Sequence, residues 1–175
     1  MNSDRNIAGF LEDHAIRRAR HVALQEGDRV ITYAELDPLV KQTARHLNDS
    51  GIKADDIIGV ALKDSADHLI VMFALARLGA VILPLDWRWT SEEKSRLTTF
   101  FGVERAITEP ESNFGNIICL PVDQAWQSAV ADKPADYPCA SGGDRPIVLS
   151  LSSGTTGRPK GPMMTHAQFI ARLMI

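Results

Sequence analysis

The sequence predicts an α/β fold with a doubly wound, mainly parallel sheet and flanking helices. Two apolar runs of strand length, residues 57–62 and 80–85, and a further short strand expected at residues 103–108 alternate with two segments of helical pattern, residues 65–78 and 90–101. The first run is continuously apolar rather than alternating, as in strands that are buried on both faces. Strands that alternate with helices in this way pair side by side in a parallel sheet.

Two starts compete for the helix that ends at Gly51. Thr32 and Glu35 have the spacing of a capping box, in which each side chain bonds the backbone of the other residue. Pro38 would then fall in the second turn, where proline removes a backbone donor. With Asp37 as the cap, Pro38 would instead take the first helical position, which suits its fixed φ.

The remaining patterns complete one domain over residues 1–175. Residues 109–116 and 131–145 are rich in proline, glycine, serine, aspartate and asparagine, which predicts linker-like loops. Thr165 is expected to cap the final helix. Further helices are expected at residues 7–20, around Trp126 and at 166–175, and further strands at 22–25, 29–33, 117–122 and 147–151.

Composition describes an ordinary globular chain and excludes several classes of function. The 175 residues are 45% hydrophobic and 23% charged, with a net charge of −3, which argues against a nucleic-acid or anionic-membrane surface. The longest apolar run, from Leu69 to Ala76, is far below the roughly 20 residues of a membrane span. The first residues show no secretion signal, and Cys119 and Cys139 have no metal or redox spacing, so we expect a cytoplasmic protein with reduced thiols.

Residues 152–161, Ser-Ser-Gly-Thr-Thr-Gly-Arg-Pro-Lys-Gly, have the composition of a phosphate-binding loop. They hold three glycines, four hydroxyls and a lysine within ten residues. Glycine lets backbone N–H groups approach phosphate oxygens, hydroxyls add short donors, and lysine adds a mobile positive charge. The Walker pattern G-x-x-x-x-G-K-[ST] does not fit, because only Lys160 falls in place. No helix start follows, so we expect the loop to connect two extended segments. Pro162 must then sit at a strand start or face an unpaired side.

The same ten residues closely resemble the phosphate-binding signature of the adenylate-forming superfamily, S/T-S/T-G-T-T-G-x-P-K-G, which continues here to Thr165-His166. Residues 31–36 and 78–90 are similar to two earlier motifs of that superfamily, in the same order. The resemblance covers about Phe10 to Ile175. It implies the N-terminal portion of an acetyl-CoA synthetase-like fold, ending just after the loop. The form P-L-D-W-R-W-T favours acyl-CoA synthetases over the adenylation domains of peptide synthetases, which stay open as the alternative.

The resemblance implies a two-step ligase. A carboxylic acid attacks the α-phosphate of ATP, giving an acyl-adenylate and pyrophosphate, and coenzyme A then forms a thioester. Magnesium is expected with the ATP, without an assigned ligand. The residues implied to bind the nucleotide phosphates are Ser152, Ser153, Gly154, Thr155, Thr156, Gly157 and Lys160.

The superfamily's adenine pocket, magnesium-binding glutamate and catalytic lysine lie downstream of this loop. We therefore expect no catalytic residue in these 175 residues and no adenylate formation by them alone. A non-catalytic binding module made from the same fold is the other open reading. Apolar residues of the last helix, Phe169, Leu173 and Ile175, are expected to be exposed and to favour self-association. His166 is expected to be solvated or capping, and Trp87 and Trp89 to be packed or partly exposed.

Overall fold

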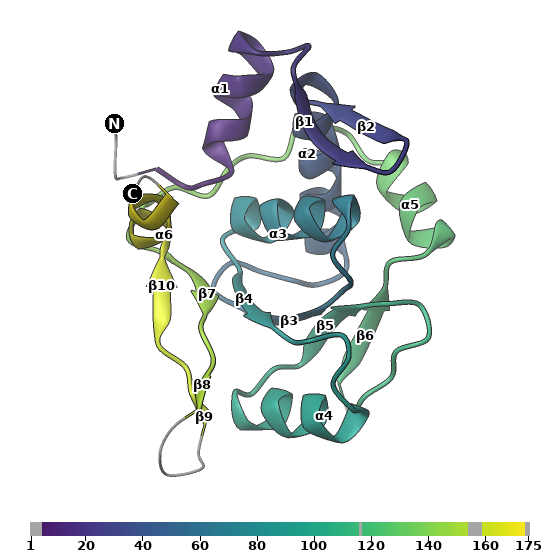
Figure 1. The fold of residues 1–175 in the computed structure, drawn as a ribbon, viewed down its shortest axis with the longest axis vertical. Helices are drawn as coiled ribbons and strands as arrows, with labels where there is room; N and C mark the ends of the chain where they lie inside the picture. The colour runs from purple at the N-terminus through teal and green to yellow at the C-terminus, as the bar shows by residue number, and fades with distance from the viewer. Residues whose placement is uncertain (1–4, 116, 154–158, 174–175) are drawn as a thin grey trace.

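Helices and strands alternate along the chain in the predicted order (Figure 1). The computed structural model describes residues 5–115, 117–153 and 159–173, with the backbone alone at 152–153, 159–160 and 173. The helices are α1 (Gly9–Arg17), α2 (Tyr33–Asp49), α3 (Ala66–Leu78), α4 (Ser91–Phe100), α5 (Gln124–Ala131) and α6 (His166–Leu173). The strands are β1 (Val22–Glu26), β2 (Arg29–Thr32), β3 (Ile57–Ala61), β4 (Val81–Pro84), β5 (Arg105–Thr108), β6 (Ile118–Pro121), β7 (Pro146–Leu149), β8 (Ser152–Ser153), β9 (Pro159–Lys160) and β10 (Met163–Thr165).

The main sheet has the strand order β10-β7-β4-β3-β5-β6 over the described residues. Strands β3 to β7 in this sheet run parallel, and β10 runs antiparallel to β7. Helices α2 and α3 lie over one face and α4 over the other (Figure 1). The chain passes from β4 through α4 to β5, on the far side of β3, so the sheet is wound in both directions. The predicted α/β, doubly wound and mainly parallel fold is therefore confirmed.

Both faces of the sheet are covered, which explains the continuous apolar runs. Along β3, Ile58 and Val60 belong to the core between the sheet and helices α2 and α3, whereas Ala61 belongs to the core between the sheet and α4. Along β4, Ile82 points to the first core and Leu83 to the second. Successive side chains of a strand point to opposite faces, so every position of these strands must be apolar.

Helix α2 begins at the first of its two predicted starts. The Thr32 N–H donates to the Glu35 carboxylate at 2.8 Å, which fixes the first turn, and Pro38 lies inside the helix. The alternative start at Asp37 is wrong. The Asp37 side chain is buried and accepts a hydrogen bond from Lys41 at 2.7 Å instead of capping a helix.

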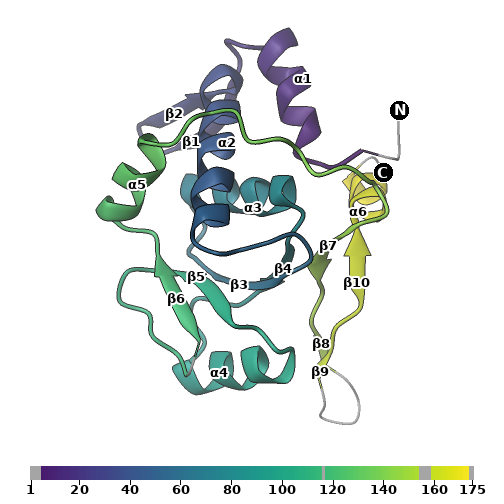
Figure 2. The same cartoon turned by 180° about the vertical axis from the view of Figure 1, so that it is seen from behind.

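A segment without helix or strand, residues 132–145, carries the chain from α5 across α2 to β7 (Figure 2). The side chain of Arg77, only 2% exposed, holds this segment. Its Nε donates to the Tyr137 carbonyl at 2.7 Å, and its own carbonyl accepts from the Ala140 N–H at 2.8 Å. The guanidinium also donates to Glu12 on α1 at 2.6 Å. These contacts bring β7 to its place beside β4.

The last helix does not match the expected pattern of exposure. Phe169 is partly buried, because it packs against the core formed with α2 and α3. The Leu173 side chain and Ile175 lie outside the described residues. Large apolar side chains that do reach the surface include Phe100 on α4 and Met163 on β10. No described helix combines the length and apolar character that crossing a membrane requires.

Candidate functional site

Three of the predicted phosphate-binding residues, Ser152, Ser153 and Lys160, lie on the two strands of a β-hairpin, here named the phosphate hairpin, residues 150–162. Its arms are β8 and β9, which pair antiparallel, with Ser152 opposite Lys160 and Ser153 opposite Pro159. Residues 154–158 connect the two arms. The prediction that this loop joins two extended segments, and not a strand and a helix, is confirmed.

The base of the phosphate hairpin is tied to the main sheet by backbone pairing. The Ser150 N–H donates to the Pro162 carbonyl at 3.0 Å, and beyond it Leu149 pairs with Met163. Pro162 comes directly before β10, at the strand start that its missing donor requires. The Pro162 carbonyl still accepts a hydrogen bond, so the proline does not interrupt the backbone pairing between the hairpin and the sheet.

The structure describes three of the seven predicted site residues, by their backbone alone. Ser152 and Ser153 lie on β8 and Lys160 lies on β9, each described by its backbone. The other predicted contacts, Gly154, Thr155, Thr156 and Gly157, lie outside the described residues. Their role in binding phosphate stays a prediction, which is taken up under the proposed function.

The hairpin follows β7 at the carboxyl edge of the parallel strands, where ligands bind in open α/β sheets. The ends of β3, β4 and β5 bring Lys63, Trp87 and Glu109 to the same edge. The Lys63 N–H donates to Glu109 at 2.8 Å, and the Lys63 ammonium lies 5.3 Å from the centre of the Trp87 ring. Sequence reasoning missed Lys63 and Glu109, because only the order of the parallel strands makes them neighbours.

Charges at this edge are already paired with each other. Arg88 donates to both oxygens of Asp86, at 2.9 and 2.6 Å, and these bonds lower the pKa of Asp86 to about 2. The Lys63 ammonium lies 3.9 Å from the second oxygen of Glu109. Each of these two cations therefore has a carboxylate partner. Trp87 is 43% exposed and Trp89 is partly buried, as expected for both.

His166 differs from its prediction, because it is fully buried. Its Nδ1 accepts a hydrogen bond from the Ile7 N–H at 3.2 Å, and its Nε2 is buried without a partner among the described residues. Burial, and to a smaller degree the positive charge of Arg145, lower the pKa of His166 to about 4. The ring is therefore neutral and fastens the N-terminal segment to the start of α6, away from solvent.

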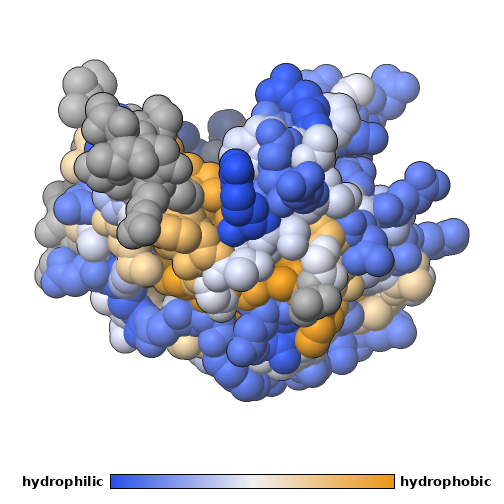
Figure 3. All heavy atoms as spheres, turned by 90° about the horizontal axis from the view of Figure 1, so that it is seen from below, coloured by the Kyte–Doolittle hydropathy of each residue, from blue (hydrophilic) through white to orange (hydrophobic). Residues whose placement is uncertain are grey.

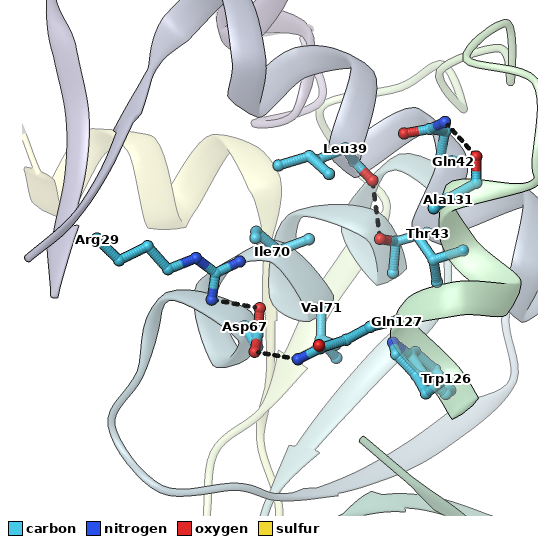
Figure 4. Close-up of a pocket in the computed structure, with 11 residues that line it drawn as sticks. Arg29, Leu39, Gln42, Thr43, Asp67, Ile70, Val71, Trp126, Gln127 and Ala131 are labelled. Carbon is cyan, nitrogen blue, oxygen red and sulfur yellow. Dashed lines mark hydrogen bonds and ion pairs between the residues drawn. The ribbon is translucent and has the colours of Figure 1, made fainter. Parts of the chain in front are cut away.

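Two hollows lie on the helical side of the molecule, away from the phosphate hairpin. One, of about 250 Å³, opens between β2, α2, α3 and α5 (Figure 4). Its polar groups satisfy one another, since Asp67 accepts from Arg29 at 2.9 Å and from Gln127 at 3.4 Å. The other, of about 400 Å³, is mostly apolar and lies between α1, β1, α2, α3 and α6.

Neither hollow presents a free charged group for a nucleotide. Among the residues that the structure describes, no three histidine, cysteine, aspartate or glutamate side chains cluster as a metal site. No magnesium ligand is therefore assigned to this part of the chain.

Comparison with known proteins assigns the family. The family model described as "AMP-binding enzyme" matches residues 11–175. This chain belongs to the AMP-binding enzyme family. The resemblance inferred from residues 152–166 is thereby confirmed.

Relatives of this AMP-binding chain include two peptide synthetases. Phosphinothricin tripeptide synthetase PhsC of Streptomyces viridochromogenes is 36% identical over an alignment of 168 positions, and the match covers 93% of this chain and 16% of PhsC. Surfactin synthase subunit 2 of Bacillus subtilis is 30% identical over an alignment of 171 positions, and the match covers 94% of this chain and 5% of the surfactin synthase polypeptide. The expected preference for acyl-CoA synthetases is thus less well supported than its alternative, the adenylation domain.

Solved structures agree with the fold. The N-terminal subdomain of Klebsiella oxytoca NpsA, in complex with 3-hydroxybenzoyl-AMSN, superimposes with a TM-score of 0.82 at 24% identity. The superposition covers 98% of this AMP-binding chain and 43% of the NpsA chain. The chain therefore spans less than half of the length of that subdomain.

Proposed function

We propose that this AMP-binding chain supplies the phosphate-binding part of an adenylation unit of the peptide-synthetase type. The observation that carries the proposal is the pairing of β8 with β9 beyond the carboxyl end of β7, with Ser152 and Ser153 on one strand and Lys160 on the other. The 36% identity to PhsC supports the choice of a peptide synthetase over an acyl-CoA synthetase.

The reaction is the activation of a carboxylate by ATP. A carboxylate oxygen attacks the α-phosphorus, the bond from that phosphorus to the bridging oxygen breaks, and pyrophosphate leaves with the bonding electrons. The product is an acyl-adenylate. A thiol then attacks its carbonyl carbon and AMP departs, which leaves a thioester. For a peptide synthetase the thiol belongs to a carrier protein, whereas an acyl-CoA synthetase uses coenzyme A.

The phosphate hairpin contributes positioning and charge stabilisation to the first step. The hydroxyls of Ser152, Ser153, Thr155 and Thr156 and the amides from Gly154 to Gly157 would donate to the β- and γ-phosphates. Lys160 would offset the charge that grows on the departing pyrophosphate. Magnesium would accompany the ATP phosphates, and no step is assigned to it.

The test is ATP–pyrophosphate exchange by the polypeptide at the length at which its own cells make it. We expect exchange that depends on an added amino acid or aryl acid. Lys160→Ala is expected to lower the exchange rate by about 100-fold, the size of effect seen when one donor to a developing charge is removed. Lys53→Ala is the matched control, because Lys53 is exposed and precedes β3 at the opposite edge.

Other outcomes separate the remaining readings. Exchange that requires a fatty acid, with release of a coenzyme A thioester, would replace the peptide-synthetase reading by the acyl-CoA synthetase one. A cellular product of 19.2 kDa that shows no exchange would favour a non-catalytic module. Exchange that survives Lys160→Ala undiminished would remove the role proposed for the phosphate hairpin.

A further inference from the structure

We propose that Phe101, at the end of α4, is a positioning residue that seats the base of the phosphate hairpin against Gly161. The inference rests on the proposed function, because it deepens the role of the hairpin in binding ATP. Phe101 lies 60 positions before Gly161 in the chain and outside the phosphate-binding signature. Its place in the fold alone brings it to the site.

The backbone of Gly161 lies directly on two side chains. A Cβ added to Gly161 would stand 2.5 Å from Leu149 Cδ2, 2.7 Å from Phe101 Cε1 and 3.0 Å from Phe101 Cζ. Real Cβ atoms essentially never approach other heavy atoms to less than 3.0 Å. The hairpin reaches this close contact with α4 and β7 only because residue 161 has no side chain.

Glycine is needed at position 161 for space and not for backbone conformation. Glycines with positive φ include Gly79 and Gly102, but Gly161 has no such φ. The backbone of residue 161 therefore does not require the left-handed region, and an L-residue is excluded there by the steric clash of its Cβ. The neighbours of that missing Cβ, Leu149 and the Phe101 ring, are thus the structural reason for this glycine.

Both neighbours are held in place, so neither yields easily. Leu149 is 2% exposed in the core over α4. Phe101 caps α4, where its N–H donates to the Leu97 carbonyl at 3.1 Å, and its ring meets Phe100 edge-on at 4.9 Å. The chain then turns at Gly102, whose φ is 65°. Phe101 is therefore a fixed support at the end of a helix.

The support matters because Gly161 directly follows Lys160. The hairpin extends from the end of β7 beyond the main sheet, past α4 (Figure 1). Apolar side chains reach the surface on the face that carries α4 (Figure 3). Any shift of Gly161 on the Phe101 ring also shifts the Lys160 backbone. A misplacement of about 1 Å at a site of charge stabilisation costs up to about 100-fold in rate.

The first experiment measures the contact itself on the 175-residue chain by amide hydrogen exchange. Phe101→Ala is expected to speed exchange of the Ser150 N–H, which bonds Pro162 across the hairpin base, by about tenfold or more, while amides of β3 and β5 keep their rates. Ile118→Ala is the control, because Ile118 is 53% exposed on β6, at the opposite end of the strand order from β10 and β7, and is not among the atoms nearest to Gly161. Unchanged exchange at Ser150 in Phe101→Ala would overturn the inference, as would an equal effect of Ile118→Ala.

The second experiment measures the consequence in ATP–pyrophosphate exchange by the polypeptide at its native length. Phe101→Ala and Gly161→Ala are each expected to lower kcat/KM for ATP by about tenfold, with the KM for the carboxylate unchanged. In the double variant the missing ring no longer meets the added methyl, while Leu149 still does, so the combined loss is expected to be smaller than the product of the two single losses.

The outcomes keep this inference separate from the proposed function. Losses that multiply in the double variant, or a KM that rises equally for ATP and carboxylate, would overturn the positioning role of Phe101. The role proposed for Lys160 in binding phosphate would not be affected. A wild-type protein without exchange activity would remove the proposed function instead. The hydrogen-exchange result would then still decide whether Phe101 holds the hairpin.

Discussion

His166 is one residue through which acid should destabilise this protein. The imidazole is fully buried, and its Nδ1 accepts the Ile7 N–H at 3.2 Å, which it does only while that nitrogen is unprotonated. Burial and the nearby Arg145 lower its pKa to about 4, from 6.5 in an exposed histidine. A protonated ring would place an N–H against the Ile7 N–H and leave a charge in the core.

The sign and size of the effect follow from these two pKa values. As the pH falls below 6.5 the unfolded chain takes up a proton on His166 before the folded protein does, so the free energy of unfolding decreases. Two pKa values of 6.5 and about 4 correspond to a full loss of about 3 kcal/mol, reached below pH 4. Between pH 7 and pH 5 the loss is about 2 kcal/mol. Above pH 7 this histidine has no further effect.

The assay is urea unfolding of wild type and His166→Asn at pH 7, 6 and 5. The asparagine amide oxygen keeps an acceptor for the Ile7 N–H and does not titrate. We expect the wild type to lose about 2 kcal/mol more than the variant over this range. His46, whose pKa burial also lowers, is present in both proteins and cancels in the difference. Equal pH dependence of the two proteins would refute the structural role given to His166.

Three further predictions concern the fold and the activity. Glu12→Gln removes the carboxylate beside the Arg77 guanidinium, which is only 2% exposed, so urea unfolding should show a loss of about 2 kcal/mol. Asp13→Asn should cost less, because its partner Arg5 is 36% exposed. Thr90→Ala should cost about 1 kcal/mol in the same assay, because Thr90 accepts from the Glu93 N–H at the start of α4. The 175 residues alone should release no pyrophosphate from ATP with magnesium, carboxylic acids and a thiol. Turnover above background would contradict that expectation.

Elements whose ends carry local chemistry were predictable from the sequence. Ser65 caps α3 by accepting from the His68 N–H at 3.1 Å, and Gly79 ends that helix in the left-handed region, with φ of 86°. Both signals act within one turn of the chain, so no knowledge of the sheet is needed to interpret them. The extended arms of the phosphate hairpin were predictable for the same reason, because no helix start follows Lys160.

Features that depend on strand order were not predictable. The bond from Lys63 to Glu109 spans 46 positions and forms only because β3 and β5 are parallel neighbours. The burial of His166 depends on the segment at Ile7, 159 positions earlier. The packing of Phe101 on Gly161 likewise needs α4 to lie on the face beside β7. Sequence patterns assign residues to helices, strands and faces, but not which distant residues meet.

The most direct test is the structure of the native-length protein with a non-hydrolysable ATP analogue bound. We expect the β- and γ-phosphates to lie within about 3 Å of the Lys160 ammonium and of hydroxyls from Ser152 to Thr156. Phosphates bound elsewhere, with residues 152–161 making no contact to the nucleotide, would show that this hairpin does not bind the phosphates of ATP.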